Sequence, residues 1–209
     1  MTRLIIWRHG NTDWNAEGRV QGQTDVPLND LGRSQAATAA PLLGGMEPDA
    51  IYSSDLQRAR STAAALSGLA GLPIVEDARL RERHYGEFQG LTNPEIAERF
   101  PEAHARWSGG DPDVGCGVER NDDVGKRVGE ALREIADRHA GELVVIATHG
   151  GAARQGFGDL LAWPLDVMSM IRPLQNCHWT ELVDTPNRGW QLRAHNVGPW
   201  PEKSIPAPV

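Results

Sequence analysis

Cysteine is almost absent from this chain of 209 residues, which contains only Cys116 and Cys177. Two cysteines so far apart can form neither a disulfide framework nor a zinc site with four cysteine ligands. We therefore expect a protein that works in a reducing compartment, with the cytoplasm as the default location.

Long apolar runs are absent as well. The N-terminal run at residues 4–7 is too short for the apolar region of a signal peptide. No run approaches the ~20 residues that a membrane-spanning helix needs. The sequence therefore predicts a soluble, intracellular protein without a membrane partner.

Positive charge is in the minority, and lysine is nearly missing. The chain has 28 acidic and 21 basic residues, a net charge of -7, and its only lysines are Lys126 and Lys203. Such a charge repels polyanions and argues against a nucleic-acid partner. An anionic substrate must then meet local positive charge, and the planar fork of arginine suits the paired oxygens of a phosphate.

The composition is otherwise that of an ordinary globular protein, with 40% hydrophobic and 23% charged residues. A chain of this length favours one domain, which we place at residues 1–198. Residues 199–209 contain four prolines and are expected to form a loose C-terminal tail.

Short apolar runs alternate with helix-forming segments along the chain. Continuous apolar runs predict buried strands, and segments rich in Ala, Leu and Arg predict helices. Strands are expected at residues 4–7, 49–53, 73–75, 142–148, 177–183 and 190–195, and helices at residues 30–43, 55–69, 119–139 and 151–161. This alternation predicts an α/β fold: a three-layer sandwich with a mostly parallel central sheet flanked by helices, in which the last two strands form an edge.

The pattern loosens between residues 81 and 117, where glycine and proline interrupt a single short helical patch at residues 93–99. We expect residues 83–119 to form a lid-like insertion that covers a site and selects the substrate. His84, Tyr85 and Trp107 are candidates to line it, with packing as the favoured role of Trp107.

Two histidines directly follow two of the predicted strands. The first strand leads into Arg8 and His9, and the strand at residues 142–148 leads into His149 and Gly150. Ligands of open α/β sheets bind beyond the carboxyl ends of the strands, so these histidines should meet there if their strands are neighbours. For either histidine alone, a structural role at the strand end would be an equally good interpretation.

This pattern suits phosphoryl transfer. An imidazole can attack phosphorus when one nitrogen is unprotonated and the other donates its proton, usually to a carbonyl. Arginines hold the phosphate and offset its charge: Arg8 is adjacent to His9, and Arg58 lies near the start of a predicted helix. Glu82, at the start of the irregular stretch, is the candidate acid that protonates the leaving oxygen.

Residues 8–15, with the sequence RHGNTDWN, resemble the RHGxTxxN signature of the histidine phosphatase superfamily, in its phosphoglycerate mutase-like branch. Further segments agree with that branch in the same order, and the match covers residues 3–183. These segments are GQTDVPL at residues 22–28 with Gly32, residues 54–63, Glu82 with Gly86 and Gly90, and HGG at residues 149–151.

The resemblance implies a role for each matched residue. His9 is implied to be the phosphorylated nucleophile, and Glu82 the acid that later acts as a base. The implied phosphate pocket and the expected substrate-binding set together comprise Arg8, Asn15, Gln21, Gly22, Arg58, His149 and Gly150. The resemblance implies neither a metal nor an organic cofactor.

The chain departs from the family pattern in three places. Asn29 stands where Thr or Ser is frequent, Phe88 where Trp is frequent, and residues 117–120 read GVER where Gly-Glu-Ser is common. Asn29 can cap a helix as well as serine can. The third departure concerns the loop around Glu119 and therefore the selection of the substrate.

Three functions are compatible with these residues. The favoured one is a phosphatase for a small phosphomonoester of the phosphoglycerate or sugar-phosphate type, since residues 176–180 resemble an NxxWT stretch of actinobacterial phosphatases that act on such compounds. A cofactor-dependent phosphoglycerate mutase shares the pocket but usually has a longer lid region. The third is an inactive module that binds a phosphate ligand or a partner, although every expected chemical residue is present here. A homodimer is expected on general frequency alone.

Overall fold

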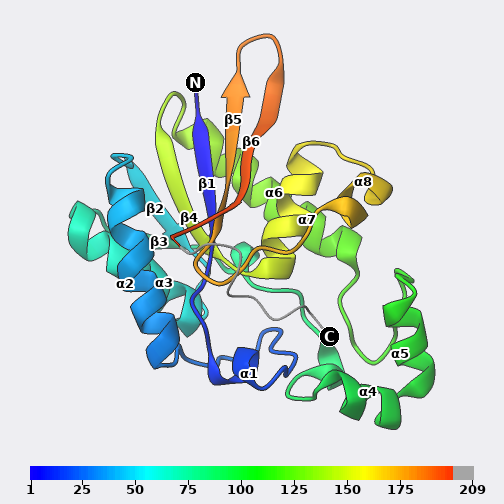
Figure 1. Ribbon diagram of the computed structural model, residues 1–209. Helices are drawn as coiled ribbons and strands as arrows, with labels where there is room; N and C mark the ends of the chain where they lie inside the picture. Colours follow the sequence, from blue (N-terminus) through cyan, green and yellow to red (C-terminus); the bar gives the residue numbers. More distant parts are fainter. Residues whose placement is uncertain (200–209) are drawn as a thin grey trace.

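A six-stranded sheet forms the centre of the molecule, with the strand order β3-β2-β4-β1-β5-β6 (Figure 1). The strands from β3 to β1 are parallel, and β5 and β6 add an antiparallel pair at one edge. This confirms the predicted α/β fold and its late edge strands. The strands are β1 (Arg3–Arg8), β2 (Ala50–Ser53), β3 (Ile74–Glu76), β4 (Leu143–Thr148), β5 (Trp179–Thr185) and β6 (Gly189–Val197).

The structure is a computed structural model that describes residues 1–199, apart from the side chains of residues 165, 166 and 169. The tail predicted at residues 199–209 therefore lies outside the described residues from residue 200 on. Within the described part of the chain, no helix combines the length and the apolar character needed to cross a membrane.

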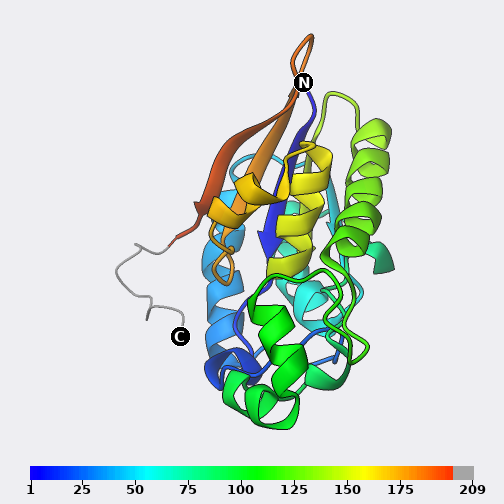
Figure 2. The ribbon, with the colours of Figure 1, turned by 90° about the vertical axis from the view of Figure 1, so that its right-hand side faces the viewer.

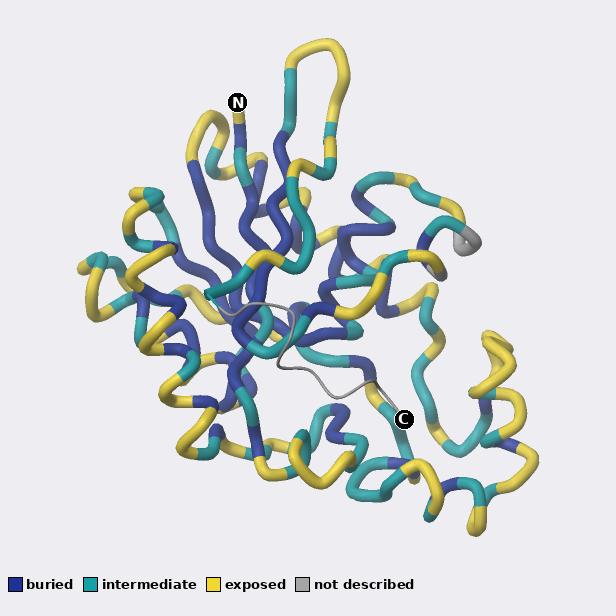
Figure 3. The backbone as a smooth tube through the Cα atoms, viewed as in Figure 1, coloured by how far each residue is buried: buried dark blue, intermediate teal, exposed yellow. Residues whose placement is uncertain are grey.

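Helices cover both faces of the sheet because its central strands bury side chains on both sides. On one face, apolar residues of β1 pack with α2 (Asp30–Gly44) and α3 (Gln57–Ala70). On the other face, alternate residues of β1 pack with α6 (Asn121–Arg138) and α7 (Gly150–Leu160). Figure 2 shows these layers from the side, and Figure 3 shows that the central strands are buried while the outer turns of the helices are exposed.

The helices that flank the site begin at specific hydrogen bonds. The Asn29 side chain accepts a bond of 2.9 Å from the Gly32 N–H and caps α2, the role expected for it. α3 begins at Gln57 rather than at residue 55, and the Gln57 N–H donates to the Asp25 carboxylate at 2.7 Å. The start of α3 is therefore held by a residue of the loop that follows β1.

The segment between α3 and α6 contains more structure than its sequence predicts. It forms η1 (Ala78–Leu80), η2 (Gly86–Phe88), α4 (Asn93–Arg99) and α5 (Pro101–Ser108). α4 is the predicted helical patch, but α5 was not predicted, because Pro101 looked like an interruption. It occupies the first turn of α5, where a helix needs no N–H.

A small apolar cluster holds this segment together. Phe88, Ile96, Ala103 and Val114 are buried in it, and Trp107 packs against them. In Figure 1, α4 and α5 lie below and to the right of the carboxyl end of β1. Two further short helices, α1 (Asp13–Ala16) and α8 (Leu165–Met170), were also not predicted, because four and six residues are too few for a periodic pattern.

Candidate active site

The structure brings the two strand-end histidines together. β1 and β4 are parallel neighbours whose last residues, Arg8 and Thr148, are paired, so the next residue of each strand emerges at the same edge of the sheet. The ring centroids of His9 and His149 are 5.2 Å apart. His9 is only 3% exposed, and His149 is fully buried. The topology alone therefore creates a histidine pair beyond the strand ends.

The hydrogen bond of His9 determines which of its nitrogens is free. Nδ1 lies 2.7 Å from the Gly10 carbonyl oxygen, which can only accept, so Nδ1 carries the proton and Nε2 keeps a lone pair. Burial, followed by the charges of Arg58 and Arg8, lowers the pKa of His9 well below its usual value, against the opposing effect of the bond to Gly10. His9 is therefore a neutral imidazole with a free nitrogen.

His149 is held differently. Its Nδ1 accepts a hydrogen bond of 3.2 Å from Arg58 Nε, so the proton lies on Nε2, which donates to Ser54 Oγ at 2.9 Å. Burial and the neighbouring charges of Arg58, His9 and Arg8 lower the pKa of His149 well below its usual value. In this arrangement His149 is a neutral side chain that positions Arg58.

Arg58 lies in the first turn of α3, and its side chain is completely buried. Nη1 donates to the Thr24 carbonyl at 2.8 Å and Nη2 to the Gly22 carbonyl at 2.6 Å. Burial lowers the pKa of Arg58 to about 10, so the group is still positively charged at neutral pH. Gly22 has a positive φ of 53°, and a β-carbon there would lie 2.1 Å from Gln89 Oε1, so this loop requires glycine.

Arg8 has a free donor. Its Nη1 donates to the Leu174 carbonyl at 2.5 Å, but its buried Nε has no hydrogen-bond partner. A β-carbon at Gly150 would lie 3.4 Å from that Nε, so the glycine leaves the donor open. Burial lowers the pKa of Arg8, and the nearby Glu82 carboxylate opposes this effect. An unsatisfied, charged donor beside a cavity is a site for an anion.

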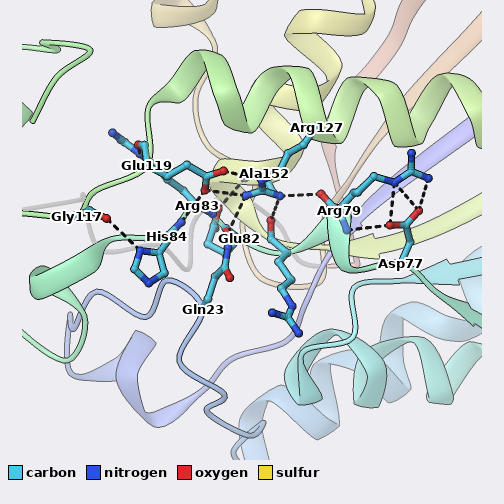
Figure 4. A network of polar contacts seen from close by, with 11 residues as sticks. Gln23, Asp77, Arg79, Glu82, Arg83, His84, Gly117, Glu119, Arg127 and Ala152 are labelled. Atoms are coloured by element: carbon cyan, nitrogen blue, oxygen red, sulfur yellow. Dashed lines mark hydrogen bonds and ion pairs between the residues drawn. The ribbon is translucent and has the colours of Figure 1, made fainter.

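Glu82 faces the same region from the loop after η1. Its Oε1 accepts from the N–H groups of Ala152 and Arg83, both at 2.8 Å, and Oε2 accepts from the Gly151 N–H at 3.0 Å. These bonds hold the Glu82 side chain at two free N–H groups at the start of α7, and Figure 4 shows the one from Ala152.

The remaining predicted residues lie in the loop after β1. Asn15 Oδ1 accepts from the Thr12 N–H at 3.2 Å and from Asn176 Nδ2 at 3.3 Å. Gln21 is 8% exposed, and its Oε1 is buried without a hydrogen-bond partner. The amide of Gln21 is therefore available for a ligand.

Two adjoining cavities are open at this place. The first, of about 170 Å³, is lined by Arg8, His9, Asn15, Arg19, Val20, Gln21, Gly22, Arg58, Glu82, Tyr85 and Trp107. The second, of about 380 Å³, is lined by Arg8, Glu82, Arg83, Tyr85, Trp107, Asn121, Gly150, Gly151, Arg154, Gln155 and Pro173. The two cavities share Arg8, Glu82, Tyr85 and Trp107. All the predicted site residues line one or both cavities except His149, and of the candidates from the insertion Tyr85 and Trp107 line both cavities whereas His84 lines neither.

Several residues near the site were not predicted as part of it. Ser54 holds the His149 ring, and Asn176 Nδ2 donates to the His9 carbonyl at 3.0 Å. Arg154, on the first turns of α7, lines the second cavity. The sequence offered one signal for Arg154: it lies four residues after Gly150 in a predicted helix, and residues four apart share a helix face. Among the side chains that the structure describes, no group of three or more His, Cys, Asp or Glu residues is arranged to bind a metal.

Comparisons with known proteins identify the family. The model of the histidine phosphatase superfamily (branch 1) matches residues 4–198. The metal-independent phosphoserine phosphatase of Arabidopsis thaliana is 43% identical over 158 residues, which cover 74% of this chain and 66% of that protein. The glucosyl-3-phosphoglycerate phosphatase of Mycolicibacterium vanbaalenii is 37% identical over 188 residues, which cover 87% of this chain and 84% of that protein.

The solved structures agree. The structure of a mycobacterial glucosyl-3-phosphoglycerate phosphatase with VO3 has a TM-score of 0.86 and 36% sequence identity, covering 94% of this chain and 99% of that one. All three relatives are named as phosphatases, which confirms the predicted phosphomonoester hydrolase class. The chain belongs to the histidine phosphatase superfamily, as the resemblance of residues 8–15 predicted.

Proposed function

We propose that this protein hydrolyses a small phosphomonoester that carries a carboxylate, through a phosphohistidine formed on His9. The observation that carries the proposal is the free Nε2 of a neutral His9, in a cavity where the buried Arg8 Nε has no partner. A nucleophile beside an unsatisfied cationic donor suits the attack on a phosphate dianion.

In the first step, His9 Nε2 attacks phosphorus while the bond between phosphorus and the ester oxygen breaks. No proton has to leave His9 first, because its lowered pKa keeps it neutral. Arg8 and Arg58 hold the non-bridging oxygens, together with the side-chain N–H groups of Asn15 and Gln21. Glu82 donates a proton to the leaving oxygen, which departs as an alcohol.

In the second step, Glu82 is a carboxylate and takes a proton from a water molecule. The water oxygen bonds to phosphorus as the bond between phosphorus and Nε2 breaks. Inorganic phosphate leaves, and both His9 and Glu82 return to their starting states, so the cycle consumes one water and one ester.

The larger cavity supports a substrate with a carboxylate. Arg83 and Arg154 line it, and neither forms an ion pair with a side chain that the structure describes. Burial raises the pKa of Tyr85 to about 12, so its hydroxyl remains a donor. A carboxylate on the leaving group would neutralise this positive charge, as in phosphoglycerate or phosphoserine.

The test compares two substrates that differ only in that carboxylate, 3-phosphoglycerate and glycerol 3-phosphate. We expect kcat/KM to be at least ~10-fold higher for 3-phosphoglycerate, and Arg154→Gln to remove most of this preference. If Arg154 were needed only for folding, its replacement would lower kcat/KM equally for 3-phosphoglycerate and glycerol 3-phosphate. An unchanged preference in Arg154→Gln would contradict the role of Arg154.

A mutase is the alternative that shares this pocket, and the same substrate distinguishes it. 3-Phosphoglycerate is incubated with and without 2,3-bisphosphoglycerate, and both phosphate release and isomerisation are measured. We expect phosphate release in both cases. Efficient isomerisation without phosphate release would overturn the proposed hydrolysis.

We also propose a cytoplasmic location and a small phosphomonoester as the main partner. The two separate cysteines and the net charge of -7 support a reducing compartment without a nucleic-acid partner. A homodimer stays a prediction from frequency alone, and the absence of a cofactor stays a prediction from the resemblance.

A further inference from the structure

A single arginine outside both cavities contacts the loop that carries Glu82. Arg127 extends from α6, and its Nη1 donates to the carbonyl oxygens of Arg79 and Arg81, both at 2.7 Å. Its Nη2 donates to the carbonyl oxygen of Glu82 at 3.0 Å. Figure 4 shows this guanidinium between α6 and the loop. Three carbonyls in four successive residues are thus fixed to α6 by one side chain.

The same guanidinium binds Glu119, at the far end of the segment 83–119. Arg127 Nε donates to Glu119 Oε1 at 2.7 Å, and Nη2 donates to Glu119 Oε2 at 3.0 Å. Together with the three carbonyls, these bonds give each of the five N–H donors of Arg127 an acceptor. No donor is left for a ligand, so Arg127 has a structural geometry rather than a substrate-binding one.

Glu119 in turn holds the residues that follow Glu82. Its Oε2 accepts from the His84 N–H at 2.9 Å, and its own N–H donates to the His84 carbonyl at 2.8 Å. Arg83 Nε donates to the Glu119 carbonyl at 2.6 Å. Burial would raise the pKa of Glu119, but the bonds from Arg127 and His84 outweigh burial and lower it. Glu119 is therefore ionised at neutral pH.

We infer that Arg127 is a positioning residue for Glu82: with Glu119 it fixes the backbone on both sides of the acid, so that the carboxylate stays at the start of α7 and faces the leaving oxygen. The inference rests on the proposed function of Glu82. Through the same bonds, Arg127 connects both ends of the segment 83–119 to Glu82. The segment and the proton donor therefore keep a fixed position relative to each other.

The experiment separates proton transfer from overall stability. An aryl phosphate such as p-nitrophenyl phosphate needs little protonation of its leaving oxygen, whereas an alkyl phosphate such as 3-phosphoglycerate needs it fully. Both substrates are assayed with the full chain and with Arg127→Gln, Arg127→Lys and Glu119→Gln. The control is Arg133→Gln, which removes another α6 arginine, one that pairs with Asp159 of α7 and does not touch the Glu82 loop.

We expect Arg127→Gln to lower kcat for the alkyl phosphate about 10-fold more than for the aryl phosphate, with little change in KM. The selective loss in Arg127→Lys should be smaller than in Arg127→Gln but still measurable, because a lysine ammonium cannot donate to all five acceptors. Glu119→Gln should also lower the ratio of kcat for the alkyl phosphate to kcat for the aryl phosphate, but by a smaller factor than Arg127→Gln. Arg133→Gln should leave the ratio unchanged. Equal losses on both substrates, or a ratio like that of Arg133→Gln, would overturn the inference.

A double variant tests whether Arg127 acts through Glu82. Glu82→Gln alone should lower the alkyl-to-aryl ratio, and adding Arg127→Gln should lower it no further. A further selective loss in the double variant would show that Arg127 acts by another route. If Glu82→Gln itself leaves the ratio unchanged, the proposed acid is wrong and both ideas fail. If only Arg127→Gln leaves it unchanged, the inference alone fails.

Discussion

In the proposed mechanism, His9 acts as a nucleophile because its surroundings keep its Nε2 unprotonated. The bond from Nδ1 to the Gly10 carbonyl orients the ring, and burial, followed by the charges of Arg58 and Arg8, disfavours the imidazolium. The same two arginines attract the substrate phosphate. One arrangement of charge thus prepares the nucleophile and binds its target.

Replacement of this ring should abolish the reaction. We expect His9→Ala to lower kcat by at least ~10⁴-fold, because no other imidazole among the described residues lines the smaller cavity. In the wild type, base quenching within milliseconds of mixing with a ³²P-labelled substrate should trap the label on His9. Retained turnover in His9→Ala, or label on another residue, would contradict the mechanism.

A site residue could be predicted where the residues that reveal its role lie next to it in the sequence. His9 and Arg8 could be predicted because a buried strand and a known signature lie next to each other in the chain. Ser54, Arg127 and Arg154 could not, because their roles arise from contacts between distant segments. Arg127 in particular looks like any solvated helix arginine until the carbonyls it binds are known.

The contact between the loop after β1 and helix α2 shows what an element requires of its residues. A β-carbon at Gly32, in the first turn of α2, would lie 2.0 Å from the Asn11 carbonyl oxygen, and one at Gly10 would lie 2.4 Å from the Gly32 carbonyl oxygen. Both contacts would be with backbone atoms, so the clash could not be relieved by the movement of a side chain. The first turn of α2 thus packs directly against the loop that follows the nucleophile.

We therefore expect Gly32→Ala to destabilise the protein by about 2 kcal/mol or more and to lower activity, because the Asn11 segment must shift. The matched control is Gly68→Ala in α3, where a β-carbon would meet no atom within 4 Å. That variant should gain up to ~1 kcal/mol from helix propensity. Urea unfolding of both variants gives the comparison, and equal effects would refute this explanation of the contact.

Among the elements, the strands and long helices were predictable because their apolar patterns are continuous. α5 was missed because proline in its first turn resembles a break when seen without the helix. The segment from η2 to α5 depends on a cluster of four buried residues spread over 27 positions, from Phe88 to Val114. Such a cluster has no period, so only the folded arrangement reveals it.

On the scale of the whole molecule, the two site histidines make stability depend on pH. Both are buried, with pKa values well below 6.5 in the folded state. The unfolded chain binds protons at these residues below about pH 6.5, whereas the folded chain does not, so stability falls as the pH is lowered through that value. Each residue contributes at most about 1.4 kcal/mol per pH unit.

Urea unfolding at pH 7.5, 6.5 and 5.5 should reveal this dependence. Between pH 6.5 and 5.5, we expect the slope of the unfolding free energy against pH to be about 1 kcal/mol per unit smaller in His9→Gln than in the wild type. Gly68→Ala, which changes no ionisable group, is the control and should keep the wild-type slope. The same slope in all three proteins would show that His9 binds protons equally when folded and unfolded.

The position of β1 between β4 and β5 has a consequence for biosynthesis. His9 leaves the ribosome about 140 residues before His149, which directly follows β4. Until then β1 has neither of its neighbours, and an N-terminal fragment holds His9 without the pocket that makes it reactive. A chain that ends before β4 therefore lacks a neighbouring strand of β1, and we expect it to have no phosphatase activity.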